Sequence, residues 1–466
     1  MRRLLTGCVA AFALQTTAAA AEASPAGMDT DGRARLIVLT DIGNEPDDSQ
    51  SLVRLLVYAN ELDIEGLVAT TSIWQRDRVQ RPLITERIAA YGEVVDNLRV
   101  HAEGYPDEAA LMSVVRSGVA AYGMDGVGDG RDTEASRLIV EAADRDDDRP
   151  LWISVWGGAA DLAQALWTVR ATRSPEDLAR FVARLRVYSI SDQDDAGPWI
   201  RRTFPQLFWI ASVHGWNNYP MAAWYGISGD INRAQKWPDA DMVSDDWRAA
   251  NIELGPLGSM YPKRTFIMEG DTPALLHMIP NGLGVLDHPE YGGWGGRYSL
   301  SDPAAGHYGD VVDEVVADDG AYYRSNQATV FRWRAAFQRD FAARIAWTMT
   351  PDFSAANHSP VLRVAGVGGD APILVTAKSG DHITLDADGS TDPDGSEITY
   401  RWWHYIEPSL AFRLAPLAIA DATTQRAVVA IPAVNQTTVF HVILEATDSG
   451  SPSITRYRRV MIQVNP

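Results

Sequence analysis

Short apolar runs alternate with amphipathic segments through the first two thirds of the chain. Residues 36–39 form a strand-like apolar run, residues 49–60 carry apolar side chains at helical spacing, and residues 64–70 are apolar again. The same order recurs over residues 150–169. A strand, loop, helix, strand sequence implies parallel neighbours joined by right-handed crossovers. We therefore predict an α/β fold with a mostly parallel sheet.

Polar residues collect directly after the carboxyl ends of several of these runs, where open α/β sheets bind ligands. These residues are Asp41, Glu45, Asp47 and Asp48 after the first run, Ser191, Asp192, Asp194 and Asp195 after residues 185–190, and His214, Trp216, Asn217 and Asn218 after residues 207–213. The first group places four carboxyl groups within eight residues. Such groups repel one another unless a cation or sugar hydroxyl groups neutralise or bind them, although Asp47 or Ser49 could also serve only as a helix cap.

The character of the sequence changes after about residue 358. Residues 328–348 resemble one amphipathic helix and a connector rich in Pro, Ser and Asn follows, after which short alternating runs are separated by turn residues. This pattern predicts an α/β domain over residues 33–350 and an all-β immunoglobulin-like sandwich over residues 358–466. Four acids of the predicted sandwich could bind a calcium ion or could simply belong to a turn. They are Asp386, Asp388, Asp392 and Asp394.

The N-terminal residues 1–23 have the pattern of a secretory signal peptide. Arg2 and Arg3 precede an apolar run that is too short to span a bilayer, and small residues suitable for cleavage follow. We expect a secreted or periplasmic protein without disulfides, since Cys8 in the signal is the only cysteine. The formal charge of −20 repels nucleic acid and anionic membranes, so we expect no nucleic-acid partner and no stable membrane insertion.

The acidic loop and the paired threonines after the next strand carry a family resemblance. Asp41, Gly43, Asp47 and Asp48, with Thr70 and Thr71, fit the pattern of the calcium-dependent inosine-uridine nucleoside hydrolases, whereas Leu39 replaces the first Asp of that pattern and Glu45 and Pro46 lengthen the loop. A longer pattern, over residues 40–60, 65–74, 269–273 and 290–298, resembles exported nucleoside hydrolase-like proteins known as cellulose-binding, which carry a C-terminal β-sandwich. Residues 385–403 resemble PKD and cadherin-like repeats.

The resemblance implies a calcium site. By it, Asp41 is both a Ca²⁺ ligand and the base that activates water, Asp48 and Asp271 are further ligands, and Trp156 supplies a backbone carbonyl. Asp47 would accept hydrogen bonds from sugar hydroxyl groups. Calcium suits this set because it is a hard ion that prefers six to eight oxygen ligands.

Other site roles follow from the resemblance less directly. Gly270 stands where the family has a histidine, so the general acid is open between Glu269 and His214. Asn217 and Asn218, or Gln75, could replace the sugar-binding amide. We also expect Trp294 to stack on a sugar, because its glycine-rich loop cannot easily bury it.

These residues favour an exported calcium-dependent glycoside hydrolase that acts on a small glycoside or an oligosaccharide end through metal- and Asp-activated water. A non-catalytic polysaccharide (cellulose)-binding protein on a hydrolase scaffold is the alternative, and a nucleoside N-ribohydrolase is the third hypothesis. The expected partner is a carbohydrate or glycoside. A homodimer stays open.

Overall fold

The computed structural model describes residues 32–214, 218–302, 304–409 and 415–466. The predicted signal peptide with Cys8, and Asn217, lie outside the described residues. None of the described helices is long and apolar enough to cross a membrane.

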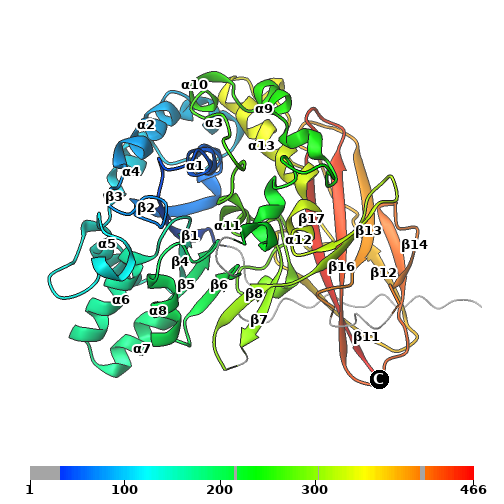
Figure 1. The fold of residues 1–466 in the computed structure, drawn as a ribbon. Helices are drawn as coiled ribbons and strands as arrows, with labels where there is room; N and C mark the ends of the chain where they lie inside the picture. Colours follow the sequence, from blue (N-terminus) through cyan, green and yellow to red (C-terminus); the bar gives the residue numbers. More distant parts are fainter. Residues whose placement is uncertain (1–31, 215–217, 303, 410–414) are drawn as a thin grey trace, which may run out of the picture.

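An eight-stranded sheet forms the centre of the N-terminal part (Figure 1). Its spatial order is β3-β2-β1-β4-β5-β6-β8-β7, and all neighbours are parallel except the pair β7 and β8. The strands are β1 (Ala34–Thr40), β2 (Leu62–Ala69), β3 (Val115–Ser117), β4 (Leu151–Val155), β5 (Leu185–Ser189), β6 (Phe208–Ala211), β7 (Tyr298–Asp302) and β8 (His307–Asp310). The predicted α/β fold with a mostly parallel sheet is confirmed.

Strand β1 is buried along its whole length because helices cover both faces of the sheet (Figure 1). Leu36 and Val38 pack into one apolar cluster, and Ile37 and Leu39 pack into another on the opposite face. The first cluster includes α1 (Asp47–Val57), α2 (Arg81–Gly92) and α13 (Arg334–Thr348), and the second includes α5 (Glu134–Ala143), α6 (Ala160–Thr172) and α8 (Ala196–Thr203). Burial on both faces explains the uninterrupted apolar run in the sequence.

Shorter helices complete this part of the fold. They are α3 (Val95–His101), α4 (Glu108–Ser113), α7 (Pro175–Ala183), α9 (Asp245–Asn251), α10 (Gly255–Gly258), α11 (Thr272–Leu276) and α12 (Ala328–Phe331). The single helix expected over residues 328–348 is wrong, because the chain forms α12 and then α13. The break is at Arg332 and Trp333, where Arg332 donates to Asp313 and Trp333 contacts aromatic rings of the C-terminal sandwich.

The C-terminal part is a β-sandwich, as predicted. One sheet has the order β11-β17-β16-β13 and the other β12-β15-β14, and residues of both sheets pack into one apolar core. The strands are β11 (Ile373–Lys378), β12 (His382–Asp386), β13 (Ile398–Tyr405), β14 (Ala418–Ala420), β15 (Arg426–Ala430), β16 (Thr438–Asp448) and β17 (Thr455–Asn465). A separate antiparallel pair, β9 (Asp313–Val316) and β10 (Tyr322–Ser325), precedes α12 and α13 in sequence.

The sandwich packs directly against the α/β part. Tyr405 and Tyr457 belong to the same apolar cluster as Phe337 of α13. The buried Arg459 of β17 donates to the backbone carbonyls of Leu283 (2.8 Å), Tyr291 (3.0 Å) and Gly292 (2.9 Å). The two parts therefore share a core. The sandwich also forms hydrogen bonds with residues 283–292, which precede β7.

Candidate functional site

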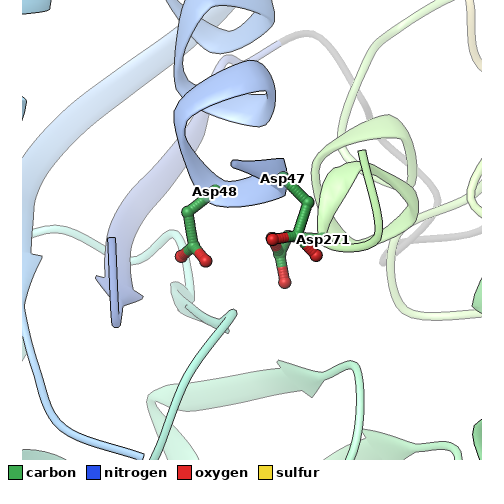
Figure 2. A group of neighbouring side chains, drawn as sticks. All are labelled: Asp47, Asp48 and Asp271. Atoms are coloured by element: carbon green, nitrogen blue, oxygen red, sulfur yellow. The ribbon is translucent and has the colours of Figure 1, made fainter. Parts of the chain in front are cut away.

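Three acids converge at the start of α1. Asp47 and Asp48 occupy the first turn of this helix, directly beyond the acidic loop that follows β1, and Asp271 immediately precedes α11. One carboxyl oxygen from each of the three lies within 4.8 Å of the others (Figure 2). Among the described residues, these three acids form the one group of acidic, histidine or cysteine side chains close enough together to hold a metal ion. The fold thus joins two positions that are more than 200 residues apart in sequence.

Burial and mutual repulsion raise the pKa values of these carboxyl groups. Burial raises the pKa of Asp41 to about 6, and burial with the charges of Glu45 and Asp41 raises the pKa of Asp47 to about 7. The pKa values of Asp48 and Asp271 lie well above the usual range, chiefly because of burial and secondly because of neighbouring acids. Such a cluster is costly to ionise unless positive charge compensates it.

Hydroxyl groups orient two of the acids, and a third acid keeps an unpartnered oxygen. Thr40 donates from its hydroxyl to Asp48, and the Ser72 hydroxyl donates to Asp41 Oδ2 at 2.5 Å. Oδ2 of Asp271 is buried without a hydrogen-bond partner. Buried polar atoms normally have partners. This oxygen could therefore serve as a ligand to a hard cation, which binds oxygen atoms.

The predicted metal ligands are only partly those that the structure brings together. Asp48 and Asp271 converge as expected, and they are joined by Asp47, which had been assigned to sugar hydroxyl groups. Asp41 is a neighbour of this group and not a member of it, although its charge raises the pKa values of Asp47 and Asp48.

The turn after β4 packs against the acidic loop. A Cβ atom on Gly157 would lie 2.8 Å from the Cβ of Asp41, so only glycine permits this approach. The Trp156 amide donates to Leu39 O at 2.8 Å, and its carbonyl accepts from the Gln193 side chain. That carbonyl retains a second lone pair, so its role as a metal ligand stays a prediction.

Gln75 supports the loop and does not present its amide to a ligand. Its Nε2 donates to the carbonyls of Asp41 (3.2 Å) and Ile42 (3.4 Å), and its Oε1 accepts from Arg78 (3.2 Å) and Gln80 (3.1 Å). The side chain is buried. The geometry corrects the expected sugar-binding role of Gln75, because every polar atom of the amide is already engaged in positioning the loop.

The two candidates for the general acid differ in their surroundings. Glu269 is completely buried and accepts hydrogen bonds from Arg54 at 2.6 and 3.0 Å and from the Tyr261 hydroxyl at 3.0 Å. Both of its oxygens are occupied by donors, which removes Glu269 as the acid. His214 is partly exposed, and its Nε2 lies 2.6 Å from Asp310 Oδ2, so His214 remains the candidate.

Trp294 is buried and cannot stack on a sugar as expected. The expectation that its glycine-rich loop leaves it exposed is wrong, since its exposed fraction is 1%. The ring packs edge-on against Phe337 and Tyr457, and the sandwich therefore covers it. Asn218 is exposed at the end of the loop after β6, and its substrate-binding role stays a prediction.

Three of the four acids of the sandwich accept hydrogen bonds from the protein, although Oδ2 of Asp392 is buried without a partner. Asp386 accepts from Arg426, Asp394 accepts from the backbone and ring nitrogens of His358, and Asp392 accepts from the amides of Asp394 and Ser396. These contacts favour the turn interpretation. No three of these acids form a metal-like group within the described part of the chain.

The sequence did not reveal Ser72 as a supporting residue, and it did not reveal the structural role of Asp194. Asp194 follows β5 and accepts from the amides of Ala159 (2.9 Å) and Ala196 (3.0 Å), which ties the turn after β4 to α8. Burial raises its pKa to about 7. The position of Asp194 after a strand was the available signal, but its partners could be recognised only once the strand order was known.

Comparison with known proteins agrees with this architecture. The family model described as "Cellulose-binding Sde182, nucleoside hydrolase-like domain" matches residues 35–298, and "Cellulose-binding protein Sde0182, C-terminal domain" matches residues 382–464. The chain belongs to this Sde182 family. A related solved structure is a nucleoside hydrolase-related hypothetical protein from Saccharophagus degradans that is associated with carbohydrate metabolism. It is 37% identical, with a TM-score of 0.80, over 93% of this chain and 100% of that one.

A second solved structure is only weakly similar to the chain. The type III effector XopQ, solved in complex with adenosine diphosphate ribose, is 11% identical over 71% of this chain and 96% of its own, with a TM-score of 0.33. A likeness at this level supports no conclusion about ligands. The comparison with curated proteins gave no match. The Sde182 relationship therefore carries the assignment of family and fold.

Proposed function

We propose that this Sde182-family chain is an exported calcium-dependent glycoside hydrolase that acts on a small glycoside or the end of an oligosaccharide. The observation that carries the proposal is the convergence of Asp47, Asp48 and Asp271, of which Asp271 has a buried oxygen without a partner. Support for a carbohydrate ligand comes from the family's description as cellulose-binding and from the carbohydrate association of the Saccharophagus degradans relative.

The donor set fits calcium. Asp47, Asp48 and Asp271 offer only carboxylate oxygens, and the Trp156 carbonyl is a further oxygen beside the loop. Hard oxygen donors suit Ca²⁺, whereas Zn²⁺ and Cu²⁺ sites usually contain nitrogen or sulfur ligands. A bound calcium ion would neutralise the carboxylates and attract the hydroxyl groups of a sugar.

Asp41 is the proposed base. Burial raises its pKa to about 6, so near neutral pH it is largely ionised and still basic enough to take a proton from water. Ser72 orients it by donating to Oδ2. As the water oxygen bonds to the anomeric carbon, one water proton passes to Asp41 and the glycosidic C–O bond breaks.

His214 is the proposed acid for the departing group. Protonated His214 would deliver its proton to the glycosidic oxygen as the C–O bond breaks, and the hydrogen bond with Asp310 orients the imidazole. Positive charge develops on the sugar ring in such a reaction, and the nearby carboxylates stabilise it.

A product assay with cello-oligosaccharides tests the proposal. We expect calcium-dependent release of reducing sugar, and we expect Asp41→Asn to lower the rate by about 10²-fold or more while calcium binding persists. Release that is unaffected by chelator, or by Asp41→Asn, would contradict the mechanism.

A non-catalytic polysaccharide-binding role is the second candidate, and Gly270 favours it. A Cβ atom at Gly270 would lie 2.8 Å from Asp47 Oδ2, so a side chain at this position would displace the Asp47 carboxylate, and the chain lacks the family's histidine here. Within the described residues, no comparable feature favours a nucleoside N-ribohydrolase, which remains the third hypothesis. Binding to insoluble cellulose without any product from oligosaccharides would support the binding role.

A further inference from the structure

Three aromatic side chains form a row beside the acid cluster. Trp74 lies in the loop after β2, Tyr219 begins the short helix η3 (Tyr219–Met221), and Trp224 lies in η4 (Ala223–Ile227). The ring centroids of Trp74 and Tyr219 are 6.3 Å apart, and those of Tyr219 and Trp224 are 5.5 Å apart. The three rings, which we call the aromatic row, are therefore contiguous although two separate strand ends supply them.

Both ends of the row meet the acids. At one end, the backbone N–H of Trp74 donates to the Ser72 hydroxyl at 3.0 Å, and the same hydroxyl donates to Asp41. At the other end, a Cβ on Gly270 would lie 2.8 Å from Asp47 Oδ2 and 3.4 Å from a ring carbon of Trp224. The backbone at the Trp74 end of the row therefore lies beside Ser72 and Asp41, and the ring at the Trp224 end lies across Gly270 from Asp47.

The middle ring faces the acidic loop. Burial raises the pKa of the Tyr219 hydroxyl, and the charges of Asp41 and Glu45 raise it further. These charges act on the hydroxyl only because it lies near them. Tyr219 thus connects the two ends of the row along the side of the acid cluster.

Core packing accounts for Trp224 but not for Trp74. Trp224 is 5% exposed, and its indole nitrogen is buried without a partner. Trp74 is 41% exposed, although burial of so large a ring would be favourable. An exposed indole that continues a row of rings is a ready surface for an apolar ligand face.

A sugar ring combines the two chemistries that this arrangement offers. Its hydroxyl groups suit carboxylates and a hard cation, and its C–H faces suit aromatic rings. An uncharged sugar is favoured over an acidic one because Asp41, Glu45, Asp47 and Asp48 surround the position. Since Trp74 is the exposed member of the row, the ring that stacks there would be the neighbour of the one at the acids.

We propose that the aromatic row is a stacking subsite for the second ring of an uncharged oligosaccharide, whose first ring lies at the acid cluster. This inference rests on the proposed function, since it assumes a sugar at the acids. It assigns Trp74 as a residue that selects disaccharides and longer chains over monosaccharides.

Calorimetric titration with glucose, cellobiose and cellotetraose tests the subsite. All variants would be made in an Asp41→Asn background so that turnover does not consume the ligand, with calcium in excess. Trp74→Ala is expected to weaken cellobiose and cellotetraose binding by about tenfold and to leave glucose binding unchanged. Trp74→Phe, which keeps a ring, should restore most of the affinity, and Tyr322→Ala, which removes an exposed aromatic side chain from β10, should have no effect.

Equal binding of cellobiose to the parent and to Trp74→Ala would overturn the inference. It would also be overturned if inosine bound more tightly than cellobiose in a Trp74-dependent manner, because the row would then serve a nucleobase. A failure of the proposed function is distinguishable. In that case reducing sugar is not released and calcium does not bind, while the loss of cellobiose affinity in Trp74→Ala would still support the stacking subsite.

Discussion

At the scale of single residues, the buried acids make folding and cation binding depend on pH. Burial raises the pKa of Asp41 to about 6 and that of Asp47 to about 7, above the usual value of an Asp in an unfolded chain. A carboxyl group whose pKa is higher in the folded state stabilises the fold at low pH, and this contribution is lost as pH rises through the folded pKa.

We therefore predict that the calcium-free protein loses stability between about pH 4 and about pH 7 because of this cluster. Calcium should raise the melting temperature more at about pH 8 than at about pH 5, since it binds the ionised acids. Thermal melts with chelator and with excess calcium measure both effects. A calcium-induced shift that is equal at the two pH values would contradict the prediction.

A second prediction at the residue scale concerns Gly270 and calcium affinity. Gly270→Ala places a Cβ 2.8 Å from Asp47 Oδ2, so Asp47 must move and calcium affinity should fall by about tenfold. Gly284→Ala is the matched control, because its Cβ would have no neighbour nearer than 4.0 Å. Calcium titration by calorimetry compares the two variants. Unchanged affinity in Gly270→Ala would show that Asp47 does not contribute to the site.

At the scale of elements, strand β1 and helix α1 could be predicted well from the sequence. The apolar run before Asp41 and the helical spacing after Asp48 are local patterns, and the polar ends of parallel strands necessarily meet at one edge. The role of Gln75 could not be predicted. An amide has the same composition whether it binds a ligand or the backbone, and only the fold places its Nε2 against the carbonyls of Asp41 and Ile42.

The structure predicts that Gln75 stabilises this element. Gln75→Ala leaves the buried Asp41 carbonyl without its donor and should lower the free energy of unfolding by about 1–3 kcal/mol. It should also reduce calcium affinity, because the acidic loop loses its support. Urea denaturation and calcium titration provide the two readouts. A variant as stable as the parent would mean that the loop is held by other contacts.

At the scale of the whole molecule, the α/β part and the β-sandwich pack together through a shared apolar cluster. Trp294 and the break before Trp333 were mispredicted for the same reason, namely that their partners are distant in sequence. Trp294 contacts Tyr457 of β17, and Trp333 contacts Tyr405 of β13. A local pattern cannot reveal such contacts, whereas the existence of the sandwich itself follows from alternating runs. The predicted domain limits, 33–350 and 358–466, stay a prediction about where the chain divides.

Substitution of Arg459 tests whether the α/β part and the sandwich unfold together. Arg459→Met removes a buried guanidinium that donates to three backbone carbonyls, so we expect a loss of about 2 kcal/mol or more and a single unfolding transition. Denaturation followed by tryptophan fluorescence and by circular dichroism checks this. Two separate transitions, with only the second affected, would indicate that the sandwich folds independently.

The most direct test of the central claim is a calcium titration of the protein and its Asp271→Asn variant by isothermal calorimetry. Within the group of Asp47, Asp48 and Asp271, Asp271 has a buried oxygen without a partner, so the structure predicts calcium binding by the parent and a loss of about 100-fold or more in affinity for the variant. Asp388→Asn, which changes an exposed acid of the sandwich, should bind calcium like the parent. No calcium binding by the parent, or equal affinity in Asp271→Asn, would contradict the account.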